Sequence, residues 1–519
     1  MTENTPKEKT QRSEFMRAQV PRSMMVFTIL LTLLYFYLIA FTFAAGNMTL
    51  FTLLIIGEIF HVFQVIMFVS TIWRMDYEAP QDKLHFEPVD IFITVVSEPM
   101  DIIEKTVRAA KAIEYPSVTV HILNDGFVAK KENWQEVEVL AKRLGVNCIT
   151  RRTPGGAKAG NINHALRVTK APLVVVFDAD HVPHPDFLKK TVPYFVDERM
   201  GFVQVPQYYK NYQLNYVTQS AWEQQQLFFG PICRGKNRLN SVTMCGTNMV
   251  IRRTALEEVG GMSETSIAED FLTGLYMHSR KWKSVYVPEI LAEGLAPEDF
   301  LSYYKQQFRW ARGSLDVIFP RNLLLLKGLT WNQRLQYFVS ISFYLSGSIV
   351  LMNALIPIVF FFTGLVPIVT STMILASIFL PYILLTLYML QKSSNFSFTF
   401  RALAFSMGQF HIHILALWSA MTRQKVKFSV TPKRAQTGNF LKLAIPHIAY
   451  VIVALVGMSY SYHTGGLTAS FIANSAWALL NVGVFLPVIY AASPQLMRNK
   501  QLSVPKLVPE EVSVSTKDI

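Results

Sequence analysis

The segment LVVVFDADHVP, residues 173–183, ends an apolar run on two aspartates, Asp178 and Asp180, that stand one residue apart. An apolar run of this length is typical of a buried strand in a parallel sheet. A buried carboxylate is costly without a partner, so the pair predicts a nearby cation. Mg²⁺ and Mn²⁺ prefer oxygen ligands and are often held by one or two carboxylates together with substrate phosphates. The alternative is that both acids only cap the helix that follows.

Two further segments carry charged groups at the predicted start of a helix. GGAKAGNINHAL, residues 155–166, is a glycine-rich approach to a helix with Lys158, an arrangement that attracts phosphate. SIAEDFLTGL, residues 266–275, places Glu269 and Asp270 at a helix start. The alternative for the first segment is an ordinary glycine loop. The alternative for the second is that its acids only complement the helix dipole.

A third helix carries a polar group of residues with a shared face. In QQFRWARG, Gln306 and Arg309 are three residues apart, and Trp310 is adjacent. The apolar neighbours predict an amphipathic helix on a membrane surface, and we expect its polar face to line a site as well. The stretch KFSVTPK, residues 427–433, would be unremarkable as a loop.

These residues need a scaffold, and the sequence predicts an alternating one. From residue 89 to about residue 282, strand-like and helix-like segments alternate, which implies a parallel sheet with right-handed crossovers. Ligands of such sheets collect at the carboxyl ends of the strands. Glu98 follows the first strand, Asp125 the second, and the D-x-D pair the fourth, so we expect these acids at one edge of the sheet.

Apolar stretches on both sides of this segment predict a membrane protein. The chain has 519 residues, of which 51% are hydrophobic and 16% charged. Lys and Arg are absent from residues 23–73, 335–391 and 443–497. Stretches of roughly 20 apolar residues can span a bilayer. The predicted spans are 24–45, 50–72, 336–361, 366–390, 441–461 and 468–492.

The distribution of basic residues predicts the topology. The short turns between paired spans carry no Lys or Arg, so the basic segments and both termini are expected in the cytoplasm. The net charge of +13 is then explained by topology and anionic lipid, and no nucleic-acid recognition motif is present. Residues 396–422 are predicted to form an interfacial amphipathic helix, with His411 and His413 on its polar face.

Taken together and in this order, the motifs resemble the catalytic subunit of bacterial cellulose synthase and related processive, inverting family 2 glycosyltransferases. The resemblance covers residues 89–497, most of the chain. It is carried by Asp125 after the second strand, A-K-A-G-N at 157–161, F-D-A-D-H at 177–181, E-D at 269–270, Q-x-x-R-W at 306–310 and F-x-V-T-x-K at 428–433. One departure is Val96, which stands where an aromatic residue commonly contacts uracil.

The resemblance implies a role for each motif. The expected catalytic residues are Asp270, as general base, and Glu269. The expected donor-binding residues are Glu98, Asp125, Lys158, Asp178, Asp180 and Arg309. Asp180 and Asp178 would hold Mg²⁺ or Mn²⁺, and Gln306 and Trp310 would bind the acceptor. Phe428, Val430, Thr431 and Lys433 would form a gating loop over the nucleotide.

The implied architecture is an α/β, GT-A-like cytoplasmic glycosyltransferase domain inserted between transmembrane helices. The implied location is the bacterial plasma membrane. The expected units are an N-terminal segment (1–23), a transmembrane hairpin (24–72), the catalytic domain with interfacial helices (73–334), a second hairpin (335–390), an interfacial helix with the gating loop (391–440), a third hairpin (441–492) and a cytoplasmic tail (493–519).

The implied activity is transfer of glucose from UDP-glucose to the non-reducing end of a growing β-glucan, with inversion and export of the polymer. The linkage stays open between β-1,4, β-1,3 and a mixture. The partners expected are the donor, the glucan, the lipid bilayer, and accessory export proteins or further copies of the chain.

Three alternatives are weighed against this. A chitin- or hyaluronan-like synthase would share Q-x-x-R-W but use a UDP-N-acetylhexosamine. A non-processive transferase would lack both Q-x-x-R-W and the loop. A transporter or receptor with a nucleotide-sensing domain would need no base, and its spans would carry charges.

Overall fold

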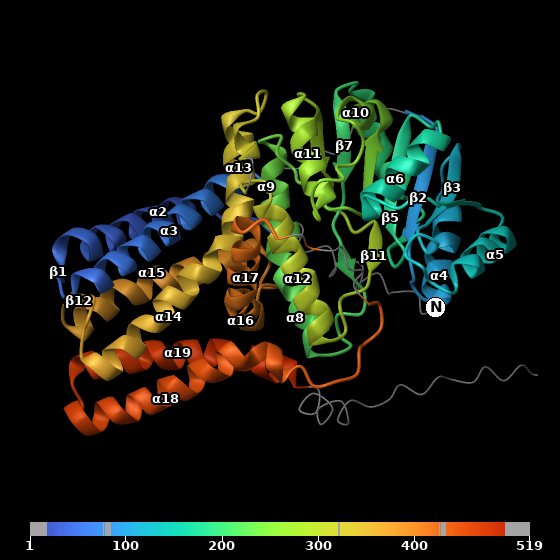
Figure 1. The fold of residues 1–519 in the computed structure, drawn as a ribbon. Helices are drawn as coiled ribbons and strands as arrows, with labels where there is room; N and C mark the ends of the chain where they lie inside the picture. Colours follow the sequence, from blue (N-terminus) through green and yellow to red (C-terminus); the bar gives the residue numbers. More distant parts are fainter. Residues whose placement is uncertain are drawn as a thin grey trace, which may run out of the picture.

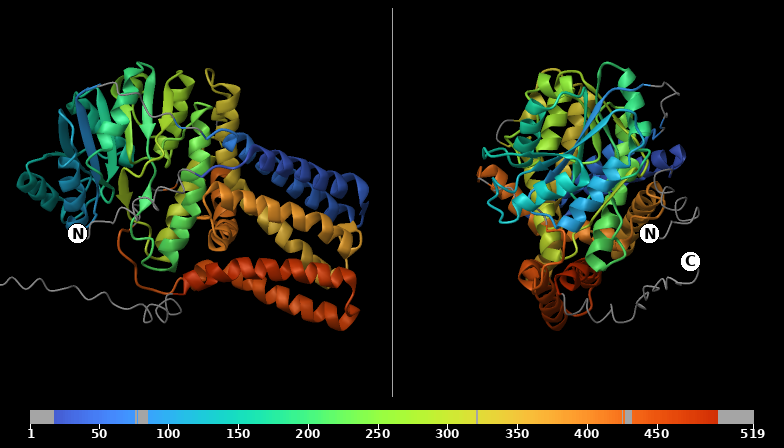
Figure 2. Two further views of the ribbon diagram at one scale, coloured as in Figure 1. Left: turned by 180° about the vertical axis from the view of Figure 1, so that it is seen from behind. Right: turned by 90° about the vertical axis from the view of Figure 1, so that its right-hand side faces the viewer.

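A computed structural model describes residues 18–75, 77, 85–319, 322–424, 426 and 432–493. Figure 1 shows two parts: an α/β domain built on a sheet, and a bundle of long helices that extends away from it. Upright helices stand between the two parts, and the view from behind in Figure 2 shows the same arrangement.

A mixed sheet forms the centre of the α/β domain. In the described part it has seven strands in the order β10-β7-β9-β5-β2-β3-β4. The strands are β2 (Val89–Val95), β3 (Val118–Asn124), β4 (Asn147–Thr150), β5 (Leu173–Asp178), β7 (Met200–Gln204), β9 (Met249–Arg252) and β10 (Lys283–Tyr286). Strands β2, β3, β4 and β5 are parallel to one another, as predicted. Strand β9 is antiparallel to both β5 and β7, which the sequence did not predict because an apolar run carries no sign of its direction.

Alternating side chains of the central strands build a core on each face of the sheet. Ile91 and Ile93 of β2 pack with Val107 of α4 (Met100–Lys111) on one face. Phe92 packs with Ile162 of α6 (Ala157–Val168) on the other. Because successive strand residues point to opposite faces, one strand serves both cores. Strand β5 is buried in the same way, with Val175 in the first core and Val176 in the second, up to its last residue Asp178.

Helices that lie between the sheet domain and the long bundle carry part of the predicted site. They are α8 (Tyr216–Leu227), α12 (Phe300–Leu315), α13 (Trp331–Ser342), α16 (Phe400–Gly408) and α17 (Phe410–Met421), and all run upright in Figure 1. The predicted interfacial helix over 396–422 is therefore two helices. They meet at Gly408, where an added Cβ would collide with the side chain of Val488.

The prediction that His411 and His413 lie on a polar face is wrong. Both side chains are buried, with 8% and 1% exposure. Helix α17 packs between α12 and α14 (Ser346–Thr363), so it has little free surface at these positions. The His411 ring lies 4.9 Å from the ring of His447.

Within the described residues, six helices are long and apolar enough to cross a membrane, which confirms the predicted number. They are Arg22–Thr42, Met48–Ile72, Trp331–Thr363, Thr372–Ser393, Leu441–Gly465 and Ala469–Ala492. The third combines α13 with α14, although α13 stands upright in Figures 1 and 2 and α14 leads away from it at an angle. The fourth begins later than predicted because Ile368–Val369 forms strand β12, paired with β1 (Ala44–Ala45).

The spans are not free of ionisable groups. Glu58 lies in α3 (Met48–Ile72), is buried, and accepts a hydrogen bond of 3.1 Å from the Tyr35 hydroxyl. An acid of this kind does not show in the distribution of Lys and Arg, from which the spans were predicted.

Candidate active site

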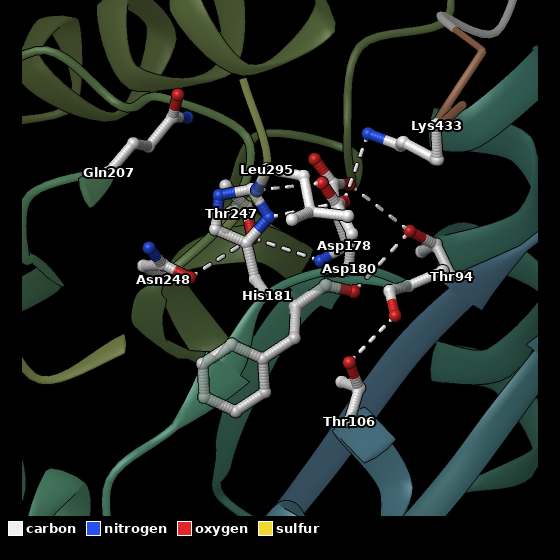
Figure 3. Close-up of polar contacts among 12 residues, drawn as sticks. Thr94, Thr106, Asp178, Asp180, His181, Gln207, Thr247, Asn248, Leu295 and Lys433 are labelled. Atoms are coloured by element: carbon white, nitrogen blue, oxygen red, sulfur yellow. Dashed lines mark hydrogen bonds and ion pairs between the residues drawn. The ribbon is translucent and has the colours of Figure 1, made fainter. Parts of the chain in front are cut away.

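The carboxyl end of β5 presents the two aspartates of the D-x-D pair at the rim of the sheet (Figure 3). The Asp178 backbone N–H donates to Thr247 Oγ1 at 2.9 Å, and Thr94 Oγ1 donates to the Asp178 carboxylate at 3.4 Å. The Leu295 N–H donates to Asp180 Oδ2 at 3.2 Å. Contacts from Thr94 of β2 and from the loop residues Thr247 and Leu295 therefore hold the two aspartates in place.

Two lysines neutralise this pair. Lys158 Nζ forms an ion pair with Asp178 and also donates to the carbonyl of Gly246 at 2.9 Å. Lys433 Nζ lies 2.9 Å from Asp180 Oδ1 (Figure 3). Burial alone would raise both aspartate pKa values, but the adjacent cations outweigh it and lower the pKa of Asp178 and of Asp180. Both acids are therefore held ionised.

The donor groups at this position suit a hard divalent cation. Ligand atoms of Asp178, Asp180 and His181 all lie within 4.8 Å of one another. Two carboxylates supply the oxygens that Mg²⁺ and Mn²⁺ prefer. His181 Nδ1 lies 3.3 Å from Asp180 Oδ1, so this ring nitrogen is on the side of the acidic pair. His181 directly follows the D-x-D pair in the sequence, and this adjacency could have indicated it as a third candidate ligand.

The two acids expected at the nucleotide end of the site lie in different surroundings. Glu98 Oε2 accepts hydrogen bonds from the N–H groups of Val96, at 2.7 Å, and Ser97, at 3.0 Å. Burial raises the pKa of Glu98, although these bonds and the charge of Lys433 oppose the shift. Asp125 is instead gripped by a bidentate pair, since two guanidinium nitrogens of Arg151 lie 2.7 Å from its two oxygens.

Arg151 was missed by the sequence analysis. Its Nη1 also donates to the carbonyl of Gly155, and its Nη2 to the carbonyl of Ala157 at 3.2 Å. It therefore ties Asp125 to the glycine-rich approach that precedes Lys158. The basic pair after β4, Arg151 and its neighbour Arg152, was the available signal.

Glu269 and Asp270 begin α11 (Glu269–Ser279). Asp270 Oδ1 accepts a hydrogen bond of 2.7 Å from the N–H of Phe271. Burial and the neighbouring charge of Asp270 raise the pKa of Glu269 to about 7. Burial also raises the pKa of Asp270, while Lys158 and Arg309 favour its ionised form. The two acids are therefore coupled, and Glu269 holds its proton to a higher pH than Asp270 does.

Gly246 connects the two acidic groups of the site. Its carbonyl accepts from Lys158, which holds Asp178, and its Cα faces Asp270. A Cβ on Gly246 would lie 2.7 Å from Asp270 Oδ2, so only a glycine leaves room for the carboxylate there. The backbone φ of +79° also favours glycine.

Helix α12 carries Gln306, Arg309 and Trp310, all of them partly exposed. Its first turn is capped by Asp299, which accepts from the Ser302 N–H at 2.8 Å. Gln306 Oε1 is buried without a hydrogen-bond partner among the described residues. The charge of Arg309 acts on both Glu269 and Asp270, which places this residue beside the acidic pair.

The structure thus connects most of the predicted residues through direct contacts or charge interactions. These are Glu98, Lys158, Asp178, Asp180, Glu269, Asp270, Arg309 and Lys433. Asp125 joins them through Arg151. Phe428, Val430 and Thr431 lie outside the described residues.

Residues 87–313 match the family model described as glycosyltransferase like family 2, and residues 257–394 match the model described as cellulose synthase. The chain carries a family 2 glycosyltransferase domain. The matched range includes every predicted site residue except those of the 428–433 segment.

Curated relatives of this glycosyltransferase are bacterial cellulose synthases. It is 28% identical over 489 residues to cellulose synthase 1 of Komagataeibacter xylinus, which covers 89% of this chain and 31% of the relative. It is 34% identical over 286 residues to a cellulose synthase catalytic subunit of Xanthomonas axonopodis, which covers 53% of this chain and 38% of the relative. The corresponding subunit of Pseudomonas fluorescens is 29% identical over 447 residues, 82% of this chain and 60% of the relative.

The chain thus spans between about a third and three fifths of the length of these relatives. Among solved structures, a mannosyltransferase of Pyrobaculum calidifontis in complex with GDP-Man and Mn2+ aligns at 16% identity and a TM-score of 0.49, over 71% of this chain and 99% of that one. The GT-A-like domain and the six apolar helices together identify a multi-pass membrane glycosyltransferase.

Proposed function

We propose that this protein transfers glucose from UDP-glucose to the non-reducing end of a growing β-glucan, with inversion, and exports the polymer across the plasma membrane. The observation that carries the proposal is the position of Asp270 and Asp178 on either side of Gly246 and Lys158. A partly buried acid that can take a proton there faces an acidic pair that can hold a cation.

Asp270 is the proposed general base. As the acceptor hydroxyl oxygen forms a bond to the anomeric carbon, its proton passes to an Asp270 carboxylate oxygen, and the bond from that carbon to UDP breaks. The raised pKa of Asp270 suits this role, because a base works best with a pKa near the operating pH. Such a base contributes a rate factor of roughly 10²–10⁴.

Asp180 and Asp178 are the proposed ligands of Mg²⁺ or Mn²⁺. The bound ion would neutralise charge on the diphosphate that leaves. Lys158 and Arg309 add fixed positive charge in a partly buried setting, where such charge is effective in stabilising a leaving anion. Lys433 adds a third cation once it releases Asp180.

Substrate binding is divided between the two ends of the site. Glu98 and Asp125 are proposed to hold the uridine, with Arg151 fixing the orientation of Asp125. Gln306 and Trp310 are proposed to bind the acceptor, because Trp310 offers a flat apolar face for a sugar ring. Phe428, Val430 and Thr431 are proposed to close over the donor and exclude water.

The proposed topology places the catalytic domain and both termini in the cytoplasm, where the nucleotide is. The basic segments on that side and the turns without Lys or Arg on the other support this orientation. Accessory export proteins or further copies of the chain are proposed partners.

The proposal is tested with purified membranes that contain the protein and are given radiolabelled UDP-glucose. Insoluble radiolabelled product that linkage-specific glucanases digest is the expected result, and the glucanase that succeeds identifies the linkage. UDP-N-acetylglucosamine in a parallel reaction tests the chitin- or hyaluronan-like alternative. Product from that donor alone would replace the proposed donor, and product from neither would contradict the proposed function.

A further inference from the structure

We propose that Arg312 is a positioning residue for the reaction: it holds the turn that carries Asp270 and ties that turn to helix α17. This inference rests on the proposed function, because it treats Asp270 as the base. Arg312 lies in the last turn of α12, six residues after Gln306, and none of the roles assigned above involves it.

Arg312 is buried, and its guanidinium group binds three partners. Nη1 forms an ion pair with Asp316, one helical turn further on. Nε donates to Ser419 Oγ at 3.2 Å, and Nη2 donates to the carbonyl of Gln424 at 3.3 Å. Ser419 lies in α17 and Gln424 just beyond its end, so one side chain joins α12 to the exit of α17.

The ion pair continues toward the base. The second oxygen of Asp316 accepts a hydrogen bond of 3.4 Å from Ser266 Oγ. Ser266 Oγ in turn accepts from the backbone N–H of Ala268 at 3.2 Å. Ala268 is the residue before Glu269, the first residue of α11. The chain of contacts therefore runs from Gln424 through Arg312, Asp316 and Ser266 to the start of the helix that presents the acidic pair.

A close backbone contact also joins helix α12 to the turn at residues 266–268. A Cβ added to Gly313 would lie 2.8 Å from the backbone nitrogen of Ala268, so α12 and the turn touch without an intervening side chain. Helix α12 therefore carries Arg309 beside the acidic pair and also sets the position of the pair. A shift of the turn by about 1 Å would move Asp270 relative to the acceptor, and misplacement of that size can cost about 10²-fold in rate.

Loss of the guanidinium group leaves the half-buried Asp316 without its cation. A half-buried carboxylate without a partner takes up a proton or turns toward solvent, and either change weakens its bond to Ser266. We expect the turn at residues 266–268 to loosen while the nucleotide end of the site, built on β2, β3 and β5, stays as it was. The turnover number should therefore fall without a matching loss of donor affinity.

The test compares Arg312→Gln, Arg312→Lys and Asp316→Asn with Arg334→Gln as the matched control. Arg334 also supports a helix start, because it donates to the carbonyls of Leu326 and Leu329, but it contacts none of the site residues that the structure describes. Arg312→Gln should lower kcat by about tenfold, which is the size of effect expected when one contact of a network is lost. The Kd for UDP should change by less than about twofold, because the nucleotide end of the site is unaffected. Arg312→Lys should restore most of kcat because it keeps the charge beside Asp316.

Amide hydrogen exchange of residues 266–272 provides a readout independent of catalysis. It should be faster in Arg312→Gln and Asp316→Asn than in the control variant, with equal melting temperatures of the whole protein. The proposal is overturned if exchange and kcat in Arg312→Gln match those of Arg334→Gln, or if kcat and UDP affinity fall together with the melting temperature. Absence of polymer from the wild-type protein would instead contradict the proposed function, and the exchange result would still decide the structural link.

Discussion

Lys433 Nζ lies 2.9 Å from Oδ1 of Asp180, the residue proposed to bind the metal ion. Lys433 stands 253 positions after Asp180 in the sequence, and its side chain reaches the end of β5 from a segment outside the α/β domain. The ammonium group and a divalent cation would compete for the same carboxylate oxygen. The resting site is thus neutralised by the protein's own cation.

This contact predicts that Lys433→Gln binds Mn²⁺ more tightly than the wild-type protein does. Removal of one positive charge within hydrogen-bond distance should lower the Kd for Mn²⁺ by about tenfold, since a nearby like charge weakens cation binding. Electron paramagnetic resonance of free Mn²⁺ measures this without turnover. Lys105→Gln, a change on the exposed face of α4, is the control and should leave the Kd unchanged. Equal Mn²⁺ affinity of Lys433→Gln and wild type would show that the two cations do not compete.

The raised pKa values of the acidic pair predict a pH dependence. Asp270 must be ionised to accept a proton, so kcat/KM should fall as the pH is lowered through the pKa of the pair. Glu269 has a pKa of about 7, raised by burial and by the charge of Asp270. Glu269 holds its proton to a higher pH than Asp270 does, so it is neutral while Asp270 titrates, and Glu269→Gln should leave the acid limb set by Asp270 in place.

A pH profile of kcat/KM from about pH 5 to pH 9 measures the position of this limb. Glu264→Gln, at an exposed acid near the same turn, should leave it in place. An acid limb that moves in Glu269→Gln but not in Glu264→Gln would mean that Glu269, rather than Asp270, sets the limb.

The close approach of Gly246 to Asp270 predicts that Gly246→Ala inactivates the enzyme. The new methyl group would lie 2.7 Å from Asp270 Oδ2 and displace the carboxylate, so kcat should fall by at least about tenfold. Gly260→Ala is the matched control, because Gly260 has a similar φ of +87° but open space around it. If both variants lose the same activity, backbone strain rather than the position of Asp270 is responsible.

The bidentate pair of Arg151 with Asp125 predicts a defect in nucleotide binding. Arg151→Lys keeps the charge but cannot hold both oxygens at once, so the Kd for UDP should rise by about tenfold. Arg152→Lys, at the exposed neighbouring residue, should change it little. Isothermal titration calorimetry with UDP compares the two, and an unchanged Kd for Arg151→Lys would remove Asp125 from the nucleotide site.

Much of the fold follows from local patterns in the sequence. The apolar run Val174–Phe177 predicts a buried strand, and the acids after it predict a polar edge at its carboxyl end. Both are confirmed because short-range burial and the alternation of strands with helices determine them. The six apolar helices are confirmed for the same reason, since length and composition suffice.

The parts that local patterns missed depend on contacts between distant residues. Nothing near Arg151 in the sequence indicates that it pairs with Asp125, and nothing near Lys433 indicates Asp180. His411 and His413 were expected on a polar face because a helix beside a membrane usually has one. Helix α17 instead packs against α12 and α14, and tertiary packing overrides the pattern.

The central claim is that Asp270 is the base of a UDP-sugar transferase whose donor is held at the D-x-D edge. Its most direct test is Asp270→Asn, assayed in membranes for polymer made from radiolabelled UDP-glucose and, after purification, for UDP affinity. The account predicts no detectable polymer from the variant and a Kd for UDP close to that of the wild-type protein. Polymer formation by Asp270→Asn at a rate comparable to wild type would contradict it.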